Sequence, residues 1–600
     1  MAVDEPNNVV AEKGDLQYHE DANTNSPPSE PHEVGATVSM TWKTWLVIFI
    51  LSSCFGLSFW PVPTTAAMEG KLAAKLGDAT GISSYWYIPA YTTGSALGFL
   101  IAGANSDLFG RRLFLLCGEV LAALGMLLSA TAKGPEQFTA GLAIAGFGGG
   151  FCQMAMCSIP ELMPNKYRHI GIALSDGFVF LIVIIGPVVG RYAIDTGDGW
   201  KYIYYGGFVA QIISLIALFL LYHPPKHPRG VPWREAIGGL DYVGTVLVMP
   251  GVCLVLVGII NTTYMSTKSI LVVVPIAIGF ALLVAFGFWE TLSKTKYPLC
   301  PPRIFRSHNG REFTVPFIVA FIVTMFYYGI EDPSHSEQYS GRSADGDLGI
   351  NIIYPTMINV FYITPTTSRS EQLLLSLPGN IGLVFGAILL ISFGNLVGHW
   401  KWSLVGSWIG MTIFGGLMAM VTPTNKSMMI AFTFLEQTFF GWAQYESIAF
   451  TQLGVHQHDL GMSGGLAGVA RYAGGSLAQA IYVSILANTQ AARAAVSVPA
   501  AVLQAGGSAT MASEILAAFP SGALALAKVP GVNAQILGAA GSAYQFAYAH
   551  ALSITALSSL AFGGVGLICC LLCENIDAKM NDTTNIFLEN DVNAAHNEYH

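Results

Sequence analysis

Charged residues are scarce in this 600-residue chain: only 11% of its residues are Asp, Glu, Lys or Arg, whereas 53% are hydrophobic. Ordinary soluble domains carry about 25% charged residues. A soluble protein of this size could not bury so much apolar surface, which argues against a soluble enzyme. Many apolar runs extend for about 18 residues or more, the length that crosses a bilayer core about 30 Å thick. We therefore predict a polytopic membrane protein.

Recognisable sites of catalysis are also lacking. The nine cysteines show none of the spacings typical of a zinc site or a disulfide framework. The chain has no nucleotide-binding loop and no spaced Ser/His/Asp set, and the histidines of HQHDL, His456 and His458, are typical of a solvated loop. We expect no enzymatic activity, no metal, no cofactor and no nucleic-acid partner.

Most of the negative charge lies in the two terminal segments. Residues 1–40 carry eight acids and one base, and residues 574–600 carry six acids and one base. The two segments together are therefore more negative than the whole chain, whose formal net charge is −9. Both segments are polar, so we predict disordered cytosolic tails. The first apolar run begins near Trp45, so we expect no cleavable leader.

The apolar runs between the tails predict fourteen membrane spans. Runs of this length satisfy their backbone hydrogen bonds in lipid as helices, so the fold class is all-α. We place an N-terminal six-helix bundle at 41–222, two extra spans with inner loops at 223–312, and a C-terminal six-helix bundle at 313–573. The predicted spans are 42–62, 86–104, 112–131, 137–159, 169–190, 201–222, 241–260, 270–289, 313–330, 371–394, 402–421, 428–452, 464–487 and 547–573.

Basic residues indicate the orientation of these spans. They are denser in the loops that contain Arg111, Lys166 and Arg303 than in the alternate loops, and such loops face the cytosol. Both termini are then predicted to be cytosolic, in a multi-pass plasma-membrane protein. The sequons at Asn261 and Asn425 fall in predicted outer loops, so they are candidate N-glycosylation sites.

Two outer segments are long. Residues 488–546 are rich in Ala and Gly with mild apolar periodicity, and we predict an outer loop with amphipathic helices lying on the membrane surface. Residues 331–350, EDPSHSEQYSGRSADGDLGI, interrupt an otherwise apolar run. A polar outer loop and an insertion encoded by an unremoved intron are both compatible with this segment.

A charged motif, GANSDLFGRR, lies between the second and third spans. Gly103 allows neighbouring helices to approach closely, and Gly110 permits a tight turn. Asp107 is costly at a membrane boundary unless a cation or a helix N-terminus faces it. A simple inner anchor would explain Arg111 and Arg112, but not the acid or the first glycine.

This motif resembles the signature loop of the major facilitator superfamily, which implies a cytoplasmic latch in which the acid contacts the other half and the bases form a charge relay. The relay role falls on Asp107 and Arg112. The family often has a base directly after the acid, where this chain has Leu108. The equivalent loop of the second half, GNLVGHWKW, keeps Gly394 and Gly398 but has no acid, so the resemblance implies a one-sided latch.

Other stretches resemble one branch of that superfamily, the fungal fourteen-helix transporters that include trichothecene efflux pumps and siderophore–iron transporters. These stretches are ELMPNKYR after span 4, the glycine-rich span 13 with a single Arg, and IGPVVGR in span 5. In the last, Gly186, Pro187 and Gly190 resemble part of the helix-packing motif of drug–proton antiporters. The arginine that such antiporters carry in span 4 is absent here.

Ionisable and amide side chains inside the spans are candidates for the transport pathway or for proton coupling. In span 12, Gln437, Gly441 and Gln444 share one helix face, and Glu446 has a depth similar to that of Arg471 in span 13, which suggests a pair. Structural hydrogen bonds are the alternative role. The candidates are Asp176, Glu436, Gln437, Gln444, Glu446 and Arg471.

We therefore predict a monomeric secondary transporter that moves a small organic substrate through the lipid bilayer by alternating access, with protons as coupling ion. Efflux of a hydrophobic metabolite or toxin is the first hypothesis. Proton-coupled uptake of ferric siderophores is the second, and a non-transporting membrane sensor is the third. Short tails argue against the sensor. The sequence does not indicate which substrate is carried.

Overall fold

The computed structural model describes residues 40–600 except 79–80, 226–232, 262–264, 266–267, 294, 331–352, 365, 520–525, 527, 585 and 598–600. The segment 331–350 therefore lies outside the described residues, and so does all of the predicted N-terminal tail except Met40. The following description concerns the described part of residues 36–600, which forms one compact unit.

The described chain is helical, as predicted, and its one β contact is an isolated bridge between Leu240 and Tyr297. Each predicted span coincides with a long helix. In the N-terminal half these are α1 (Trp42–Phe59), α4 (Tyr87–Phe109), α5 (Arg111–Ala130), α6 (Pro135–Cys152) continued by α7 (Ala155–Glu161), α8 (Arg168–Ser175) continued by α9 (Gly177–Ile194), and α10 (Gly199–Leu221).

The other eight long helices follow in the same order as the predicted spans. They are α12 (Tyr242–Asn261) and α13 (Ile270–Leu292), then α15 (Thr314–Ile330), α18 (Pro378–Val397), α19 (Trp400–Leu417), α20 (Lys426–Leu453), α21 (Leu460–Gln504) and α24 (Ala534–Leu572). Shorter helices connect them: α2 (Pro61–Ala66), α3 (Glu69–Lys75), α11 (Trp233–Gly238), α14 (Pro302–Arg306), α16 (Ile353–Met357), α17 (Arg369–Leu375) and α22 (Ala509–Ala518).

Ten of the described helices are long and apolar enough to cross a membrane on their own, or eleven if the bent pair around α14 and α15 counts as one span. The helices α4, α20 and α21 fall outside this group. They carry small and polar residues such as Ser95, Gln444 and Arg471. Such residues are typical of helices that face other helices or a pathway instead of lipid.

The apolar cores lie inside each half, and the outer faces are apolar as well. One core surrounds Trp408 and Phe440 in the second half, and another surrounds Leu51 and Phe151 in the first. The helices α12 and α13 pack on each other, and large side chains such as Phe280 and Phe288 remain exposed. Exposed apolar faces of this extent are expected for helices surrounded by lipid.

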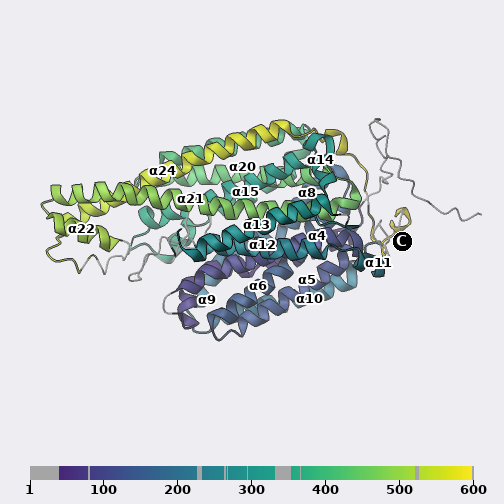
Figure 1. Ribbon diagram of the computed structural model, residues 1–600, viewed down its shortest axis with the longest axis horizontal. Coiled ribbons are helices and arrows are strands. Elements are labelled where there is room, and N and C mark those ends of the chain that lie inside the picture. The colour runs from purple at the N-terminus through teal and green to yellow at the C-terminus, as the bar shows by residue number, and fades with distance from the viewer. Residues whose placement is uncertain are drawn as a thin grey trace, which may run out of the picture. The chain divides into compact units, whose positions relative to one another are not determined.

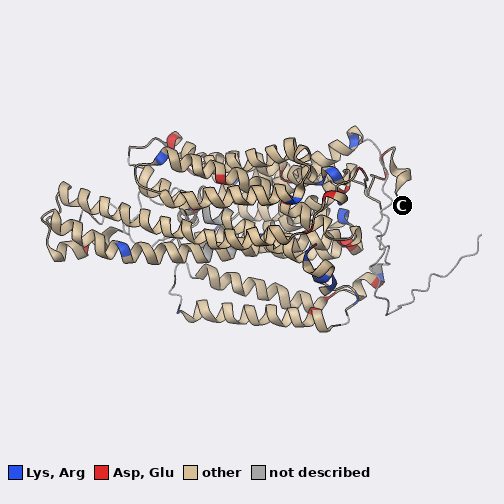
Figure 2. Ribbon diagram, turned by 90° about the horizontal axis from the view of Figure 1, so that it is seen from above, with Lys and Arg blue, Asp and Glu red and all other residues tan. Residues whose placement is uncertain are grey.

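The basic loops gather at one end of the helices, which we call the tail face because residues 574–597 lie there too (Figure 1). Figure 2 shows many of the Lys and Arg residues near this end. The helices α4 and α21, one from each half, pack side by side. This pairing brings the start of α21 against the end of α4 at the tail face.

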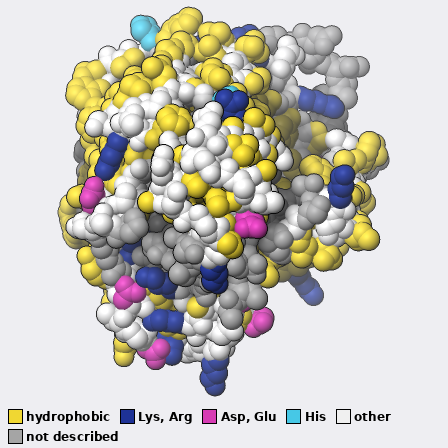
Figure 3. Space-filling model, turned by 90° about the vertical axis from the view of Figure 1, so that its left-hand side faces the viewer, with side chains coloured by type: hydrophobic (Ala, Val, Ile, Leu, Met, Phe, Trp, Pro, Cys, Tyr) yellow, Lys and Arg dark blue, Asp and Glu magenta, His cyan; other side chains and the backbone are white. Residues whose placement is uncertain are grey.

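The segment 488–546 differs from the predicted loop with surface-lying helices. The helix α21 continues to Gln504 and α24 begins at Ala534, so both helices project beyond the ends of the other long helices (Figure 1). Ala-rich sequence favours continuous helix. Apolar residues including Val498, Ile515 and Ile536 form a core between these extensions and α22. Seen from this end, charged side chains are few and lie among hydrophobic and uncharged ones (Figure 3).

The C-terminal segment also differs from the prediction of a disordered tail. Leu588 is 1% exposed and belongs to the core of the first half, and Ile576 belongs to the core of the second. Main-chain hydrogen bonds join Lys166 to Asn581 and Glu589 to His223. The segment is polar overall, but a few of its apolar side chains pack into the cores of the two halves. Burial of these side chains favours an ordered segment.

Candidate functional site

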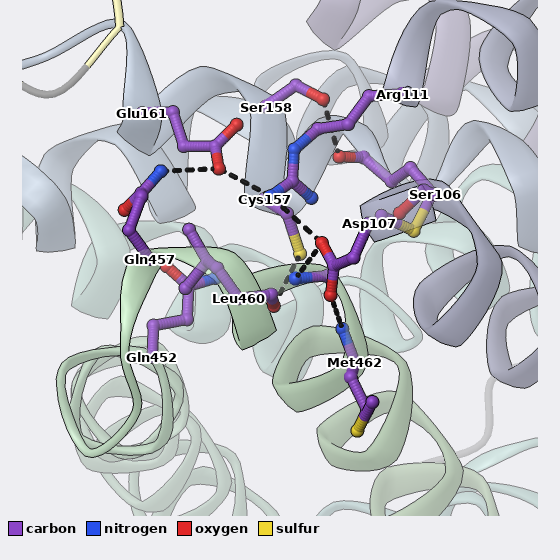
Figure 4. A network of polar contacts seen from close by, with 12 residues as sticks. Ser106, Asp107, Arg111, Cys157, Ser158, Glu161, Gln452, Gln457, Leu460 and Met462 are labelled. Atoms are coloured by element: carbon purple, nitrogen blue, oxygen red, sulfur yellow. Dashed lines mark hydrogen bonds and ion pairs between the residues drawn. The ribbon is translucent and has the colours of Figure 1, made fainter. Parts of the chain in front are cut away.

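The predicted latch motif forms the contact between the two halves at the tail face (Figure 4). The carboxylate of Asp107 is fully buried and accepts hydrogen bonds from the backbone N–H groups of Gly461 and Met462, at 3.0 and 2.9 Å. These groups belong to the first turn of α21, where backbone donors lack helical partners and the helix dipole favours negative charge. A buried acid at this position therefore holds the second half against the first.

The glycines of the motif have the geometric roles that the sequence suggested. A Cβ atom on Gly103 would lie 2.7 Å from both the Gly461 carbonyl oxygen and the Gly465 Cα, so α4 and α21 touch through their backbones here. Gly110 has a φ of 87°, in the left-handed region that favours glycine, and it separates α4 from α5.

The two arginines of the motif have different partners. Arg111 lies 3.6 Å from Asp107 and forms a closer ion pair with Glu161 of α7, and all three side chains are buried. Arg112 instead donates to the Phe219 carbonyl at 2.7 Å and lies over the Phe219 ring. The relay that the resemblance assigned to Arg112 is therefore formed by Arg111 in this structure. A buried ion pair needs this kind of network, because each charge loses its hydration.

Sequence reasoning did not assign a role to Glu161 or Gln457, although both lie in the latch. The Gln457 Nε2 atom donates to Glu161 at 2.7 Å, which joins the second half to the Arg111 ion pair. A further bond runs from Gln452 to the Met156 carbonyl at 2.9 Å. An acid at the end of the apolar stretch 137–159 was the available signal for Glu161.

A second polar cluster lies deeper, between α9, α20 and α21. Asp176, at the break between α8 and α9, accepts a hydrogen bond from the Tyr445 hydroxyl at 2.8 Å. Arg471 of α21 acts electrostatically on Asp176, and its guanidinium approaches the Met156 sulfur at 3.9 Å. Two sequence-predicted candidates from different halves therefore share one environment.

Tyr472 extends this cluster toward α4 and α6. Its hydroxyl lies 2.9 Å from the Ser95 hydroxyl and accepts from Gln153 Nε2 at 3.1 Å. Arg471 and Tyr472 are both half-buried, unlike the fully buried Asp107. The cluster thus holds an acid, a base and two phenols at the interface of the halves, a position where this fold class binds substrates.

The predicted pair between Glu446 and Arg471 is wrong. Glu446 accepts hydrogen bonds from Ser403 at 3.2 Å and from the Trp442 indole at 3.1 Å, both within the second half. Equal depth on consecutive helices did not place the two side chains on facing surfaces.

The remaining candidates of span 12 are buried within the second half. Gln437, Glu436 and Gln444 are at most 4% exposed. The face shared by Gln437 and Gly441 packs closely on α18, where a Cβ on Gly382 would lie 3.1 Å from the Gln437 Cβ. Among the described residues the Gln437 amide has no hydrogen-bond partner.

The helix-packing motif of span 5 contacts α2. A Cβ on Gly186 would lie 2.9 Å from the Pro63 side chain, and one on Gly190 would lie 2.5 Å from the Thr64 carbonyl oxygen. Pro187 stands inside α9 between them. The motif therefore brings the outer part of α9 against the short helix that follows α1.

Both sequon side chains are engaged in local hydrogen bonds. Asn261 is 7% exposed and donates to the Leu271 carbonyl at 2.8 Å. Asn425 donates to the Met420 carbonyl at 2.7 Å and accepts from the Thr422 N–H at 2.9 Å. Glycosylation at either position would require the loss of these bonds in the folded protein, so the structure gives the sequons no support.

One group of described residues has the ligand types of a metal site: His308, Glu312 and Glu574, at the tail face. Glu312 already binds Lys579 at 3.0 Å, and His308 lies 3.0 Å from Glu574. These contacts satisfy the group as a set of salt bridges.

Comparisons with known proteins agree with this geometry. Residues 71–598 match the family described as fungal trichothecene efflux pump. The chain is 39% identical to the MFS-type transporter prx5 of Penicillium rubens over 93% of this chain and 96% of that protein, and 24% identical to the trichothecene efflux pump TRI12 of Fusarium sporotrichioides over 82% and 80%. The structure of the proton:xylose symporter XylE, of the major facilitator superfamily, superimposes with a TM-score of 0.51 at 14% identity, covering 90% of this chain and 98% of that one.

Proposed function

We propose, from the premise that this chain belongs to the fungal trichothecene efflux pump family of the major facilitator superfamily, that it exports a small hydrophobic organic molecule in exchange for protons. The family and the fold show that the protein is a multi-pass membrane transporter of small organic molecules and not an enzyme. The direction of transport, the proton and the substrate are the proposed parts.

The observation that carries the proposal is the joining of the halves at two depths. At the tail face Asp107, Glu161 and Gln457 close the interface, and deeper in the protein Tyr445 contacts Asp176 across it, where Arg471 also acts electrostatically on that carboxylate. Alternating access requires that the first contact opens while the second responds to substrate or protons.

Asp176 is the proposed site of proton coupling. Its carboxylate is 4% exposed and interacts with Tyr445 and Arg471, both from the second half. A proton on Asp176 would remove its attraction for Arg471, and the cost of burying an unpaired guanidinium would then favour a rearrangement of α21. A less direct part in the pathway is proposed for the polar residues of α20, because they are buried within the second half. These are Glu436, Gln437, Gln444 and Glu446.

The proposed substrate is an apolar small molecule. The proposal follows the name of one relative, a trichothecene efflux pump. Uptake of ferric siderophores remains the second hypothesis, and no contact in the structure favours it. The protein is proposed to act as a monomer in the plasma membrane, and the basic tail face supports an orientation with both termini in the cytosol.

The test uses inside-out plasma-membrane vesicles from a yeast host that lacks its own carriers, with an acidic lumen. We expect trichothecenes or related apolar metabolites to accumulate in the lumen, and collapse of the pH gradient to abolish accumulation. Asp176→Asn should keep substrate exchange but lose the response to the gradient, whereas Asp198→Asn, at an exposed outer position, should behave as the wild type.

Two results would contradict the proposal. Iron-dependent growth of the host on ferric siderophores, without export of any apolar compound, would favour uptake. Full gradient-driven accumulation by the Asp176→Asn protein would remove the proposed coupling role and leave the export hypothesis intact.

A further inference from the structure

His169 is a buried histidine that links the two halves at the tail face. It stands in the first turn of α8, in the N-terminal half, and its ring is fully buried. The imidazole packs on the Trp400 ring with centroids 4.5 Å apart. A Cβ on Gly394 would lie 3.1 Å from its Nε2 atom, so the ring occupies space that only a glycine leaves free. Trp400 and Gly394 both belong to the second half.

The ring has no hydrogen-bond partner for either nitrogen among the described residues. A neutral imidazole leaves one donor and one acceptor unsatisfied, at about 1–3 kcal/mol each. An imidazolium would leave two donors and a full charge unsatisfied, which is far more costly. The closed tail face therefore accepts His169 only in its neutral form.

Charged groups on the surrounding elements do not compensate for a proton on this ring. Among the described residues no charged side chain is bonded to either ring nitrogen of His169. The helix α18 contributes no charged residue, and the charged groups of the other neighbouring elements interact elsewhere. In the first half these are Lys43 with Asn590, Glu161 with Arg111, Lys166 with Asp582, Arg168 with Asn165, and Asp176 with Tyr445, while Arg191 has interactions of its own. In the second half and the C-terminal segment, Glu446 binds Ser403, Lys426 binds Glu371, Lys401 acts on Cys573, Glu436 has interactions of its own, and Asp577 accepts from the Trp400 N–H and lies 3.7 Å from His399.

We propose that His169 makes closure of the tail face conditional on the loss of its proton. When the halves separate, the ring leaves the space beside Gly394 and Trp400 and reaches water, where a histidine takes up a proton near its ordinary pKa of about 6.5. Protonation then holds the face open, and release of the proton to the same solution permits closure. His169 is a positioning residue for alternating access, so this inference rests on the proposed function.

The experiment measures closure without substrate, so it can fail independently of the transport hypothesis. Spin labels at Leu113→Cys and Trp402→Cys report the distance between the halves, in a full chain whose exposed Cys117 is replaced by Ser. In lipid nanodiscs, we expect the short-distance population to fall several-fold between pH 8 and pH 5.5.

The variants assign that pH dependence to one side chain. His169→Gln, which has no titrating group, should abolish it, and His169→Leu should give a closed population at every pH. His550→Gln, at an exposed histidine of α24 far from the tail face, is the control and should keep the pH dependence of the parent protein. Melting temperatures of all variants establish that they are folded. An unchanged pH dependence in both His169 variants would overturn the proposal.

A second observation, independent of His169, concerns the C-terminal segment, which binds both halves. We call residues 574–597 the C-terminal clasp. Its first part holds the second half: the Asp577 carboxylate accepts from the Trp400 N–H at 3.0 Å, and Lys579 donates to Glu312 and to the Leu453 carbonyl, both at 3.0 Å.

The rest of the clasp holds the first half. The Lys166 N–H donates to the Asn581 carbonyl at 2.8 Å, and the Asn165 N–H donates to the Thr583 carbonyl at 3.0 Å. Farther along, Asp591 accepts from the Thr44 hydroxyl at 3.1 Å. The clasp thus crosses the boundary between the halves.

The crossing has almost no slack. Lys579 and Met580 contact the second half, and Asn581 is already bonded to the first. An extended chain spans at most about 3.6 Å per residue, so separation of the halves by more than a few ångströms must detach one part of the clasp.

Charge pairs fasten both parts. A hydrogen bond to Asp582 raises the pKa of Lys166. Partial burial raises the pKa of Glu312, but Ser307 and Lys579 outweigh it and hold that pKa below the ordinary value. A lowered carboxyl pKa means that the Glu312 contact stabilises the clasp above the ordinary pKa of about 4.3 and is lost as the pH falls through the lowered value.

We infer that the C-terminal clasp restrains opening of the tail face and must release one half in each transport cycle. A Gly-Ser-Gly-Ser insertion between Met580 and Asn581 tests this, because it leaves every contact intact and adds slack. Measured with the same spin labels, it should raise the open population at least threefold. The same insertion after Val592, beyond the contacts with either half, should have no effect.

A disulfide supplies the opposite test. Asn165→Cys with Thr583→Cys joins positions whose side chains lie 3.2 Å apart, and the oxidised protein should remain closed until a reductant is added. Equal open populations in the two insertion variants, or full opening of the oxidised protein, would exclude the restraint.

Discussion

The two halves of this transporter close their shared tail face with different chemistry. In the first half the latch loop carries its own acid, and Asp107 binds the start of α21. The equivalent loop of the second half, from Gly394 to Trp402, has no acid. There the start of α19 receives Asp577 from the C-terminal clasp, and the glycine receives His169 from the first half. The second loop thus lacks an acid of its own, and side chains from distant segments of the chain make the contacts there.

Burial makes the two contacts unequal. The Asp107 side chain is fully buried, whereas the Asp577 side chain is 30% exposed. A buried charge-assisted hydrogen bond contributes more than an exposed one, because water does not compete for the donor. The contact of the first loop should therefore contribute more to the stability of the closed state than the contact of the second loop does.

The largest effect is expected from Asp107→Asn. The variant loses the negative charge that faces the α21 N-terminus and Arg111, and hydrogen bonds to charged groups contribute about 1.5–3 kcal/mol. We expect a 10- to 100-fold loss of transport rate, measured as initial uptake into inside-out vesicles. Asn105→Ala, at a neighbour that bonds only within α4, is the control. Equal rates in the two variants would remove the latch role of Asp107.

A glycine pair compares the loops directly. Gly103→Ala places a Cβ against backbone atoms of α21 that cannot move aside, and overpacking of this kind costs about 1–3 kcal/mol. Gly394→Ala meets side-chain atoms instead, the edge of the His169 ring at 3.1 Å and a Leu390 methyl group at 3.2 Å. We expect Gly103→Ala to lower the melting temperature and the closed population clearly more than Gly394→Ala does. The reverse order would show that the second loop carries the tighter contact.

A smaller effect is expected from the two arginines of the latch motif, Arg111 and Arg112, and it should differ between them. Arg111→Lys keeps the charge but loses the fork that serves Glu161, so we expect a three- to tenfold lower transport rate. Arg112→Lys should stay within twofold of the wild type, because its partners are a carbonyl oxygen and an aromatic ring at an exposed position. Equal losses would return Arg112 to the relay that the family resemblance suggested.

The smallest effect is expected from Asp577→Asn. The side chain acts as a cap for α19 from outside its own loop, and loss of a cap costs about 1 kcal/mol. We expect up to a fivefold increase in the open population by spin-label distances, with little change in melting temperature. No change at all would mean that the clasp acts through Lys579 and the N-terminal half alone.

Several features could be predicted from the sequence because they are local. The apolar runs predicted the long helices of the described part of the chain, and the residue types of GANSDLFGRR predicted Asp107 facing a helix start. Other features depended on helix rotation. Glu446 and Arg471 have equal depth but face different neighbours, and Arg111 and Arg112 are adjacent in sequence but point to different helices.

The sequence by itself determined the class of molecule, because lipid requires long apolar helices whatever their arrangement. It also indicated the family, through a motif that resembles the family's signature loop and whose acid and first glycine a simple basic anchor does not explain. Only the tertiary structure decided which distant groups meet: His169 beside Gly394, Tyr445 beside Asp176, and the clasp across both halves. These contacts join residues hundreds of positions apart, and their free energy depends on burial and facing, which no spacing along the chain encodes.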